Sequence, residues 1–328
     1  MKEKLREVLD QYDINVTQFY RGRGAFYCHT ERGLRILKEY WGSSERLLME
    51  YKLKERLQNA GFLMVDQLVK NKEGEFIVQD RYRTPFIMKE YFEGRECNIR
   101  EESDIYEGTK NLARLHKTLR QIETKDLETY EGVAPFLMFQ KRNRELKKVK
   151  AYMQKKARKN DFEVAYIACY KMFFEEASNA WKELSRLNYG RTREKSEICH
   201  GAYHQHNILF TNNGIATVNF EKFGRNNQLL DLYLFLRKIM EKNQYRFSYL
   251  RLALEAYDQE IKLEKDNYMF LYFMFLYPEK FWKISNQYLN DKKCWISPKM
   301  LEKLSYIIQQ NEERKQFLAE YKKTFFVG

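Results

Sequence analysis

The segment from His200 to Phe223, HGAYHQHNILFTNNGIATVNFEKF, holds residue types and spacings that could support phosphoryl transfer. Five residues separate a His-Gly pair from Asn207, and a turn then leads to a strand that ends in Val218-x-x-Glu221. A loop asparagine followed one hairpin later by a polar strand-end residue is the order in which magnesium-dependent phosphotransfer sites present their metal ligands. The segment therefore predicts a catalytic-type loop and hairpin.

A phosphoryl-transfer site also needs a fixed cation for the phosphates, held in position by a carboxylate. Lys38, on a predicted strand, is the candidate cation, and Glu50, on the following predicted helix, is its candidate partner. The same two residues would also make an ordinary surface ion pair. Gly22 and Gly24 could form a turn over the phosphates, but a short Gly-x-Gly pattern is equally typical of a plain hairpin.

The elements that must position these residues fall into two parts. Runs rich in β-branched and aromatic residues predict strands at 15–20, 25–30, 34–40, 75–82 and 85–92. A serine cap and an early acid predict a helix at 43–59, and beyond Gly94 the three-to-four spacing of apolar residues predicts helices almost throughout. The sequence thus predicts an α+β, bilobal chain, with a small antiparallel-sheet N-lobe over residues 1–93 and a mostly helical C-lobe over residues 94–328.

The net charge of +13 is concentrated between Lys141 and Lys159, where ten Lys or Arg residues accompany a single acid. Such a stretch could bind an acidic partner. Apolar residues recur through it at helical spacing, so the charges would equally be the solvated face of an amphipathic helix. No RNA- or DNA-binding signature accompanies the charge, which disfavours a nucleic-acid partner.

Neither a membrane span nor a secretion signal is expected. The longest apolar run, Tyr268 to Tyr277, is far shorter than the roughly 18 residues that cross a bilayer, and it predicts a buried helix. The first twelve residues place apolar side chains on one helical face among charges, which is unlike the apolar centre of a signal peptide.

Several motifs in sequence order carry a family resemblance. HGAYHQHN resembles the HGDxHxxN loop of aminoglycoside phosphotransferases and choline kinases, and TVNFEKF resembles their IDFE or IDWE metal motif. With LRILKEYWGSSERLLMEYKLKERLQNAGF, FIMKEYFEGREC and NLARLHKTL, the chain resembles the CotS-type spore coat proteins from about Asn15 to Arg237. This resemblance implies a protein-kinase-like fold, synthesis in the mother cell, a place in the spore coat and other coat proteins as partners.

The resemblance also implies an ATP and magnesium site with assigned residues. Lys38 would bind phosphate with Glu50 as its partner, and the hinge from Met88 to Glu93, with Glu90 and Phe92, would face the adenine. His200 and His204 would orient the catalytic loop. The remaining implied roles are a metal ligand at Asn207 and an acid that anchors the loop at Asp231.

Two positions depart from the family pattern. The catalytic-base position is Ala202, which has no proton acceptor, and the principal metal carboxylate position is Asn219, which keeps an oxygen but not the charge. Losing a general base typically lowers the rate by about 10²- to 10⁴-fold, and an amide holds magnesium less well than a carboxylate. Glu221 could substitute as a metal ligand, and His204 or His206 as a base.

Three hypotheses follow from the sequence. The first is a kinase-like spore coat protein with a degenerate, inactive site and a structural or scaffolding role. The second is an active small-molecule kinase that uses ATP and magnesium to phosphorylate a hydroxyl group. The third is a basic scaffold that binds acidic partners through residues 141–159, and it is compatible with the first.

Overall fold

The computed structural model describes residues 2–124, 127, 130–187, 197–290 and 298–326, and these form two compact units. The first unit comprises Met1–Tyr130 with Ile198–Arg225, and the second comprises Glu131–Glu197 with Asn226–Gly328. The loop and hairpin singled out in the sequence thus group with the N-terminal sheet. The two predicted lobes, divided after residue 93, are not the same as these two compact units, and the lobe boundary stays a prediction.

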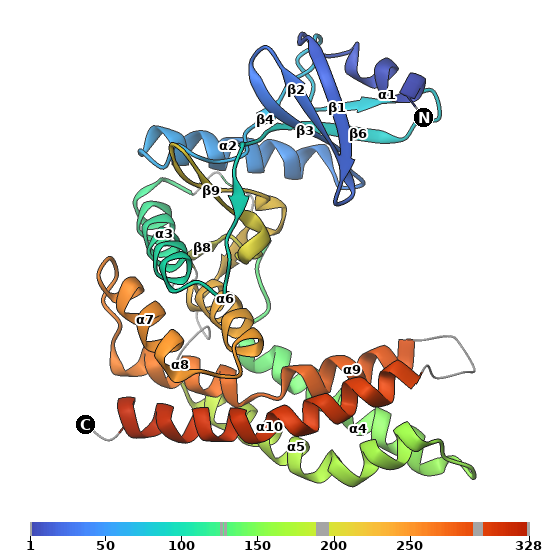
Figure 1. Cartoon of the computed structure of the whole chain (residues 1–328), viewed down its shortest axis with the longest axis vertical. Coiled ribbons are helices and arrows are strands. Elements are labelled where there is room, and N and C mark those ends of the chain that lie inside the picture. Colours follow the sequence, from blue (N-terminus) through green and yellow to red (C-terminus); the bar gives the residue numbers. More distant parts are fainter. Residues whose placement is uncertain (1, 125–126, 128–129, 188–196, 291–297, 327–328) are drawn as a thin grey trace. The chain divides into compact units, whose positions relative to one another are not determined.

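The first unit is built on an antiparallel sheet, visible at the top of Figure 1. The strand order is β1–β2–β3–β6–β4, and β5 also pairs with β6. The bounds are β1 (Val16–Gly22), β2 (Ala25–Thr30), β3 (Gly33–Glu39), β4 (Leu68–Val69), β5 (Ile77–Gln79) and β6 (Pro85–Glu90). The three antiparallel strands predicted between residues 14 and 40 are confirmed.

The β1–β2 hairpin closes through a two-residue turn, Arg23-Gly24. Both residues have positive φ, 26° and 77° respectively. A turn with two positive φ values matches the twist of the flanking strands, and glycine adopts it without steric penalty. This turn brings Arg23 to the rim of the cavity described below.

The N-terminal helix α1 (Lys2–Leu9) covers one face of the sheet core. Its residues Leu5, Val8 and Leu9, with Tyr12 just beyond the helix, pack in one cluster that includes Leu37 of β3. These are the four residues that the sequence places on one apolar face. Burial of this face explains why so charged a helix is held in place.

The predicted strand at 75–82 is wrong in its second half. Strand pairing ends at Gln79, because the Asp80 side chain accepts hydrogen bonds from the backbone N–H groups of Tyr82 and Thr84, at 2.8 and 2.9 Å. A short carboxylate that bonds the following backbone favours a turn over a strand. Arg83, with φ of 61°, completes this turn.

Helix α2 (Ser44–Asn59) begins where the sequence predicts, with the Ser43 side chain accepting from the Arg46 N–H. Its inner face is not purely apolar. Glu50 and Lys54 are buried there alongside Leu47, Leu53 and Leu57. Two fully buried charges on a helix face indicate a polar network within the unit.

The predicted catalytic-type hairpin is confirmed as β9 (Ile208–Thr211) and β10 (Gly214–Thr217), joined by a turn of two asparagines. It extends into a three-stranded sheet with β7 (Arg95–Glu96). Short helical turns flank it, and helix α3 follows β7 in the chain. The remaining bounds are α3 (Glu102–Gln121), β8 (Glu197–Cys199), η2 (Gln205–Asn207), η3 (Phe220–Lys222) and β11 (Gly224–Asn226).

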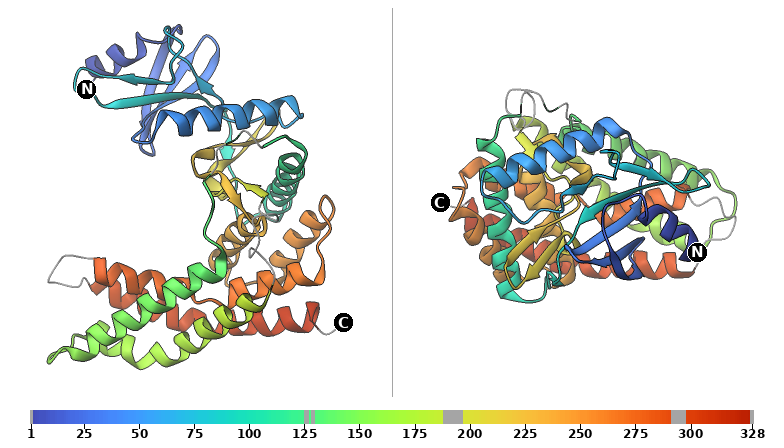
Figure 2. Two further views of the ribbon diagram at one scale, coloured as in Figure 1. Left: turned by 180° about the vertical axis from the view of Figure 1, so that it is seen from behind. Right: turned by 90° about the horizontal axis from the view of Figure 1, so that it is seen from above.

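The second unit is helical, and its long helices lie along one another in the left view of Figure 2. Helix α10 contacts α5, α8 and α9, and α4 packs on α5 and α9. The bounds are α4 (Pro135–Lys155), α5 (Asp161–Arg186), α6 (Leu229–Lys242), α7 (Phe247–Asp258), α8 (Lys265–Leu276), α9 (Glu279–Asn290) and α10 (Pro298–Phe325). The apolar run at 268–277 lies mainly in α8 and is buried, as predicted. In the part of the chain that is described, no helix combines the length and the hydrophobicity needed to cross a bilayer.

Candidate functional site

A cavity of about 220 Å³ lies within the first unit, lined by residues of the β1–β2 turn, β2, β3, β6 and the segment around the β9–β10 hairpin. Its wall combines a flat apolar part with a charged part, the usual composition of a small-molecule site. The apolar and aromatic lining residues are Ala25, Tyr27, Ile36, Tyr91 and Val218. The polar ones are Arg23, Lys38, Asp66, Lys89, Glu96, His206, Asn207, Asn219 and Glu221.

Lys38 lines this cavity, but its partner is Glu221 and not Glu50. Lys38 Nζ lies 2.5 Å from Glu221 Oε1, and each side chain keeps 26% exposure. The lysines Lys38 and Lys89 lower the pKa of Glu221 against the opposing effect of burial, so the carboxylate is held ionised. The Lys38–Glu50 pair predicted from the sequence does not form, because Glu50 is bound by two other lysines.

The first of those lysines is Lys89 of β6, whose ammonium lies among three carboxylates. Lys89 Nζ is 2.7 Å from Glu50 Oε1, 3.1 Å from Glu221 Oε1 and 3.8 Å from Asp66 Oδ2. The side chain is only 2% exposed. Burial alone would lower the pKa of Lys89, but the three carboxylates raise it above its ordinary value. A permanent positive charge therefore lies at the centre of the site.

The second is Lys54, one helical turn after Glu50 on the buried face of α2. Its ammonium donates to Glu50 Oε1, to the backbone oxygen of Asp66 at 2.6 Å, and lies 2.8 Å from Asp66 Oδ1. Burial would raise the pKa of Glu50, but Lys54 and Lys89 bring it down to about 2. We call Lys38, Lys54, Lys89, Glu50, Asp66 and Glu221 the charge cluster; its three cations and three anions balance.

The loop around His200 is held by a complete set of hydrogen bonds. The imidazole Nε2 of the fully buried His200 lies 3.1 Å from the Val218 carbonyl, and Nδ1 accepts from the Ala202 N–H at 3.2 Å. Gly201 has φ of 76°, and a Cβ there would lie 2.0 Å from the Lys222 carbonyl oxygen. Only glycine fits this close approach. The orienting role proposed for His200 agrees with this geometry.

Tyr203 ties the same loop to α3. Its hydroxyl donates to the Gly108 carbonyl at 2.7 Å and accepts from Asn111 Nδ2 at 3.0 Å. The Asn111 amide also donates to Thr217 Oγ1 of β10 at 2.9 Å. Buried polar groups that are all satisfied make a rigid frame.

The two predicted metal positions, Asn207 and Asn219, are neighbours. Asn207 Nδ2 donates to the Ala202 carbonyl at 2.8 Å, and Asn219 Nδ2 lies 3.5 Å from Asn207 Oδ1. Asn219 is left-handed, with φ of 67° and ψ of 59°, a conformation that asparagine tolerates better than most residues. Its N–H donates to Asp66 Oδ2 at 2.9 Å. Asn219 therefore contributes an amide where the family pattern has a charge.

These residues do not fit a magnesium ion bound as the resemblance implies. Magnesium requires closely octahedral oxygen ligands, usually one or two carboxylates together with phosphate and water. Asp66 Oδ1 lies 2.8 Å from Lys54 Nζ and Asp66 Oδ2 accepts from the Asn219 N–H, and Glu221, the predicted substitute ligand, binds two lysines. Searched over the described ranges, the structure contains no group of three His, Cys, Asp or Glu side chains arranged to hold a metal.

The two histidines proposed as substitute bases lie in different surroundings. His204 Nε2 lies 3.3 Å from Asn207 Nδ2, and His204 does not line the cavity. His206 does line it, with Nδ1 2.7 Å from Glu96 Oε2 and 2.7 Å from an Arg23 nitrogen. A ring nitrogen shared with a carboxylate and a guanidinium is placed to link the β1–β2 turn to β7.

The hinge strand presents its other face to the cavity. Lys89 and Tyr91 line the cavity, whereas Met88, Glu90 and Phe92 do not. Met88 is buried in the sheet core, and Phe92 packs against the hairpin. Side chains alternate along a strand, so successive residues face opposite sides of it. The sequence signal for Lys89 is a charge that directly follows the apolar run Phe86 to Met88 in a predicted strand.

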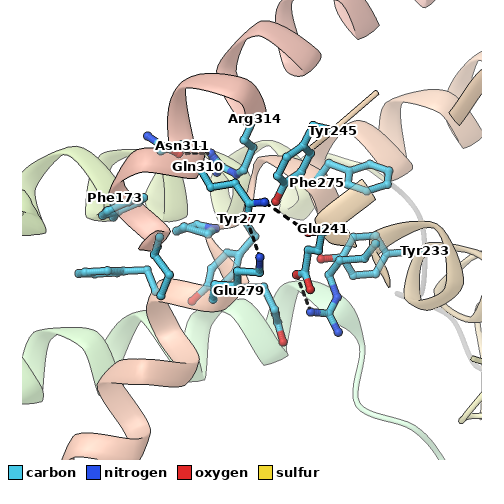
Figure 3. A pocket seen from close by; sticks show the side chains of 15 residues that line it. Phe173, Tyr233, Glu241, Tyr245, Phe275, Tyr277, Glu279, Gln310, Asn311 and Arg314 are labelled. Carbon is cyan, nitrogen blue, oxygen red and sulfur yellow. Dashed lines mark hydrogen bonds and ion pairs between the residues drawn. The ribbon is translucent and has the colours of Figure 1, made fainter. Parts of the chain in front are cut away.

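Asp231, the predicted loop anchor, is buried in the first turn of α6 and belongs to the second unit. A second cavity, of about 30 Å³, lies in that unit and is drawn in Figure 3. Two ion pairs lie around it, Arg237 with Glu241 at 2.9 Å and Arg314 with Glu176 at 2.8 Å, and Lys280 donates to the Gln310 side chain. Room for one or two waters among paired side chains indicates a polar core, and the cavity is too small for a metabolite.

The basic stretch forms most of α4. The helix buries Phe139, Leu146, Val149 and Met153, so it is amphipathic as one of the two sequence interpretations requires. Several of its cations still have structural contacts: Arg142 binds Glu279 and lies over Trp282, and Lys156 pairs with Glu163 at 2.5 Å. Lys141, Arg144, Lys147, Lys148 and Lys155 are exposed.

A family model matches residues 5–321 of the chain; its description is "Spore coat putative kinase YutH". No curated protein matched the sequence. The matched span covers nearly the whole chain, and the spore coat kinase resemblance read from the motifs is confirmed.

Solved structures with similar folds are phosphotransferases and kinases. An aminoglycoside phosphotransferase from Alicyclobacillus acidocaldarius has a TM-score of 0.85 at 18% identity, covering 98% of this chain and 96% of that one. An amicoumacin kinase in complex with AMP-PNP and Ca²⁺ has a TM-score of 0.64 at 16% identity, covering 96% and 93%. Choline kinase from Cryptosporidium parvum has a TM-score of 0.56 at 12% identity, covering 94% and 90%. The predicted kinase-like α+β fold is confirmed.

Proposed function

Because the chain belongs to the spore coat kinase YutH family, we propose that it is a non-catalytic, structural or scaffolding component of the spore coat that retains a kinase-like fold. One observation carries the proposal: Glu221 neutralises both Lys38 and Lys89 at 2.5 and 3.1 Å. The cations that would hold a transferring phosphoryl group are thereby bound to the protein itself. Transition-state stabilisation by such cations is the main source of catalysis in phosphoryl transfer.

The absence of a base at position 202 supports the same proposal. Ala202 has no proton acceptor, yet its backbone is held in the loop by His200 and Asn207. The loop is therefore assembled around a position that cannot take a proton from a hydroxyl. The loss of the general base alone lowers the rate by about 10²- to 10⁴-fold.

Within this proposal the protein is made in the mother cell, is located in the spore coat and contacts other coat proteins. The exposed cations of α4 between Lys141 and Lys159 are the candidate contact for an acidic partner. Opposite charges across such a surface would set the rate and specificity of association more than its affinity. Reversing several of these charges should then weaken partner capture from coat extracts.

The test is to restore the missing groups. The double variant Ala202→Asp, Asn219→Asp is compared with the original chain for ATP turnover, alone and with candidate hydroxyl acceptors. We expect no turnover above background in the original chain, and at least about a 10²-fold gain in the double variant, because the surrounding frame is assembled. ATP turnover by the original chain that disappears in Lys38→Ala would contradict the proposal.

A second candidate function is an active ATP- and magnesium-dependent phosphotransferase that modifies a small hydroxyl compound. The observation in its favour is that Lys38, Asn207 and His206 line one cavity. The similar amicoumacin kinase was solved with AMP-PNP and Ca²⁺. This function requires nucleotide binding that depends on a divalent cation, and turnover that is lost in His206→Ala.

A further inference from the structure

Lys89 places its ammonium group among the three carboxylates of the charge cluster, where a positive charge offsets their mutual repulsion. Its ammonium is within 3.8 Å of carboxylate oxygens from Glu50, Asp66 and Glu221. Three carboxylates around one point normally bind a metal ion or repel one another. Here Lys89 of β6 supplies the positive charge. Because its side chain is only 2% exposed, moving it out of the cluster would require moving β6 as well.

Glu221 is the most exposed of the three carboxylates in the cluster. It is 26% exposed, whereas Glu50 is fully buried and Asp66 is 4% exposed at its side chain. It lies on the short helical turn η3 and binds Lys38 and Lys89 through the same oxygen, Oε1. An anionic group of a ligand would find the same two ammonium groups if Glu221 turned aside.

We propose that the cavity binds a phosphate-bearing ligand without a divalent cation, with Lys89 in place of the metal and Glu221 as the internal group that the phosphate displaces. The inference rests on the proposed function in one respect: with Asn219 and Ala202, the site lacks both the metal-binding carboxylate and the catalytic base. The ligand class follows from the lining residues: the two ammonium groups of Lys38 and Lys89 suit a phosphate, and Tyr27, Ile36 and Tyr91 offer apolar and aromatic contacts to the group that carries it.

The charge balance supports displacement over simple addition. The cluster holds Lys38, Lys54 and Lys89 against Glu50, Asp66 and Glu221, so it is neutral as it stands. Removing the Glu221 carboxylate leaves one uncompensated positive charge in a partly buried site. A phosphate would supply negative charge in place of the carboxylate, and a divalent cation would not be needed for it to bind.

The test measures ATP binding by calorimetry and thermal shift in two buffers, one with EDTA and one with magnesium. We expect binding in EDTA and a change of less than about threefold in Kd when magnesium is added. Glu221→Gln should tighten binding in EDTA by about fivefold or more, because the competing carboxylate is removed. Glu55→Gln is the control, since Glu55 is exposed on α2 and does not line the cavity.

Two further variants test the assigned roles of Lys38 and Asn219 in binding. Lys38→Met should weaken binding in EDTA by at least about tenfold, and its partly exposed position makes it less of a risk to folding than Lys89→Met. Asn219→Asp should make binding tighten with magnesium, because it restores a metal charge beside Asn207.

Binding seen only with magnesium, no binding in either buffer, or an unchanged Kd in Glu221→Gln would each overturn the inference. None of these results reports on phosphate transfer. A failure of the proposed non-catalytic role would appear in the turnover assay instead, so the two can fail separately.

Discussion

Each unit contains a buried network of ion pairs, built on lysines in the first unit and on arginines in the second, and the two networks differ in the space beside them. In the first unit, Lys89, Glu50 and Glu221 line or support a cavity of about 220 Å³. In the second, Arg314 and Glu176 belong to a network around a cavity of about 30 Å³. The first network leaves two members, Lys38 and Glu221, 26% exposed.

The difference teaches how to separate a ligand site from a structural polar core. The Arg314 guanidinium donates hydrogen bonds to Glu176, Asn311 and the Leu276 carbonyl. It thereby joins α10 to α5 and to the end of α8. The cavity beside it, with Arg314, Gln310 and Asn311 among its lining side chains (Figure 3), measures only about 30 Å³. In the charge cluster a carboxylate with two lysines faces open volume. Ion pairs alone do not identify a site; unfilled space beside an exchangeable member does.

The largest expected effect comes from Lys54→Met, which removes the cation between Glu50 and Asp66. Both carboxylates would be left buried with fewer partners, and breaking a buried pair in this way costs about 3–5 kcal/mol. Urea denaturation measures the free energy of unfolding. The control is Lys52→Met on the same helix, which should change stability by less than about 0.5 kcal/mol. A small effect at position 54 would mean that the cluster does not stabilise the unit.

Arg314→Met tests the other network and should destabilise the protein by about 3 kcal/mol, at the lower end for a buried pair because Glu176 is 16% exposed. ATP binding in EDTA should not change. A loss of binding without a loss of stability would show that the second network is not merely structural.

The two networks should also respond to acid in opposite directions. The pKa of Glu50 is lowered to about 2, so its contribution is complete above pH 4.5 and is lost as the pH falls towards 2. Burial raises the pKa of Glu176, despite Arg314, so this group favours the folded state more as it is protonated. Urea unfolding between pH 5 and 3 should show a loss on the order of 2 kcal/mol from Glu50.

Matched variants assign that loss to its source. Glu50→Gln should flatten the acid dependence, whereas Glu176→Gln should leave the loss in place or deepen it. Equal pH profiles for the two variants would remove the distinction between the networks.

The smallest effect is expected on α4. Arg144→Glu with Lys148→Glu reverses two exposed charges outside either network, and the free energy of unfolding should change by less than about 0.5 kcal/mol per site. Urea denaturation checks this, and a large destabilisation would mean that the exposed face of α4 has a structural contact.

Residues 14–40 and 43–59 could be predicted because local signals suffice there. Strand alternation, the turn glycines and the Ser43 cap act over a few residues, and all three agree with the structure. The strand after Glu75 was predicted too long, because the Asp80 side chain captures the backbone N–H groups that a ladder would need. Turn chemistry overrode β-propensity at that point.

The candidate site divides in the same way. The His200 loop, the Asn207 position and the hairpin could be found from spacing along the chain, since they lie within one short segment. In the hinge, Lys89 and Tyr91 line the cavity, and the adenine-facing role of Met88, Glu90 and Phe92 stays a prediction. Lys54, Asp66 and Lys89 were missed. Lys54 lies on α2, Asp66 in the connection between α2 and β4, and Lys89 on β6. Nothing in their spacing along the chain shows that their side chains meet.

By itself the sequence determined which chemistry is missing: no proton acceptor at Ala202 and no charge at Asn219, because a side chain's chemistry is a property of the residue. Tertiary structure alone decided which ions pair. Lys38 is bound to Glu221 and not to Glu50 because folding buries Lys54 and Lys89 against Glu50. Pairing depends on distance and burial in three dimensions, and these arise only when the strands and helices pack.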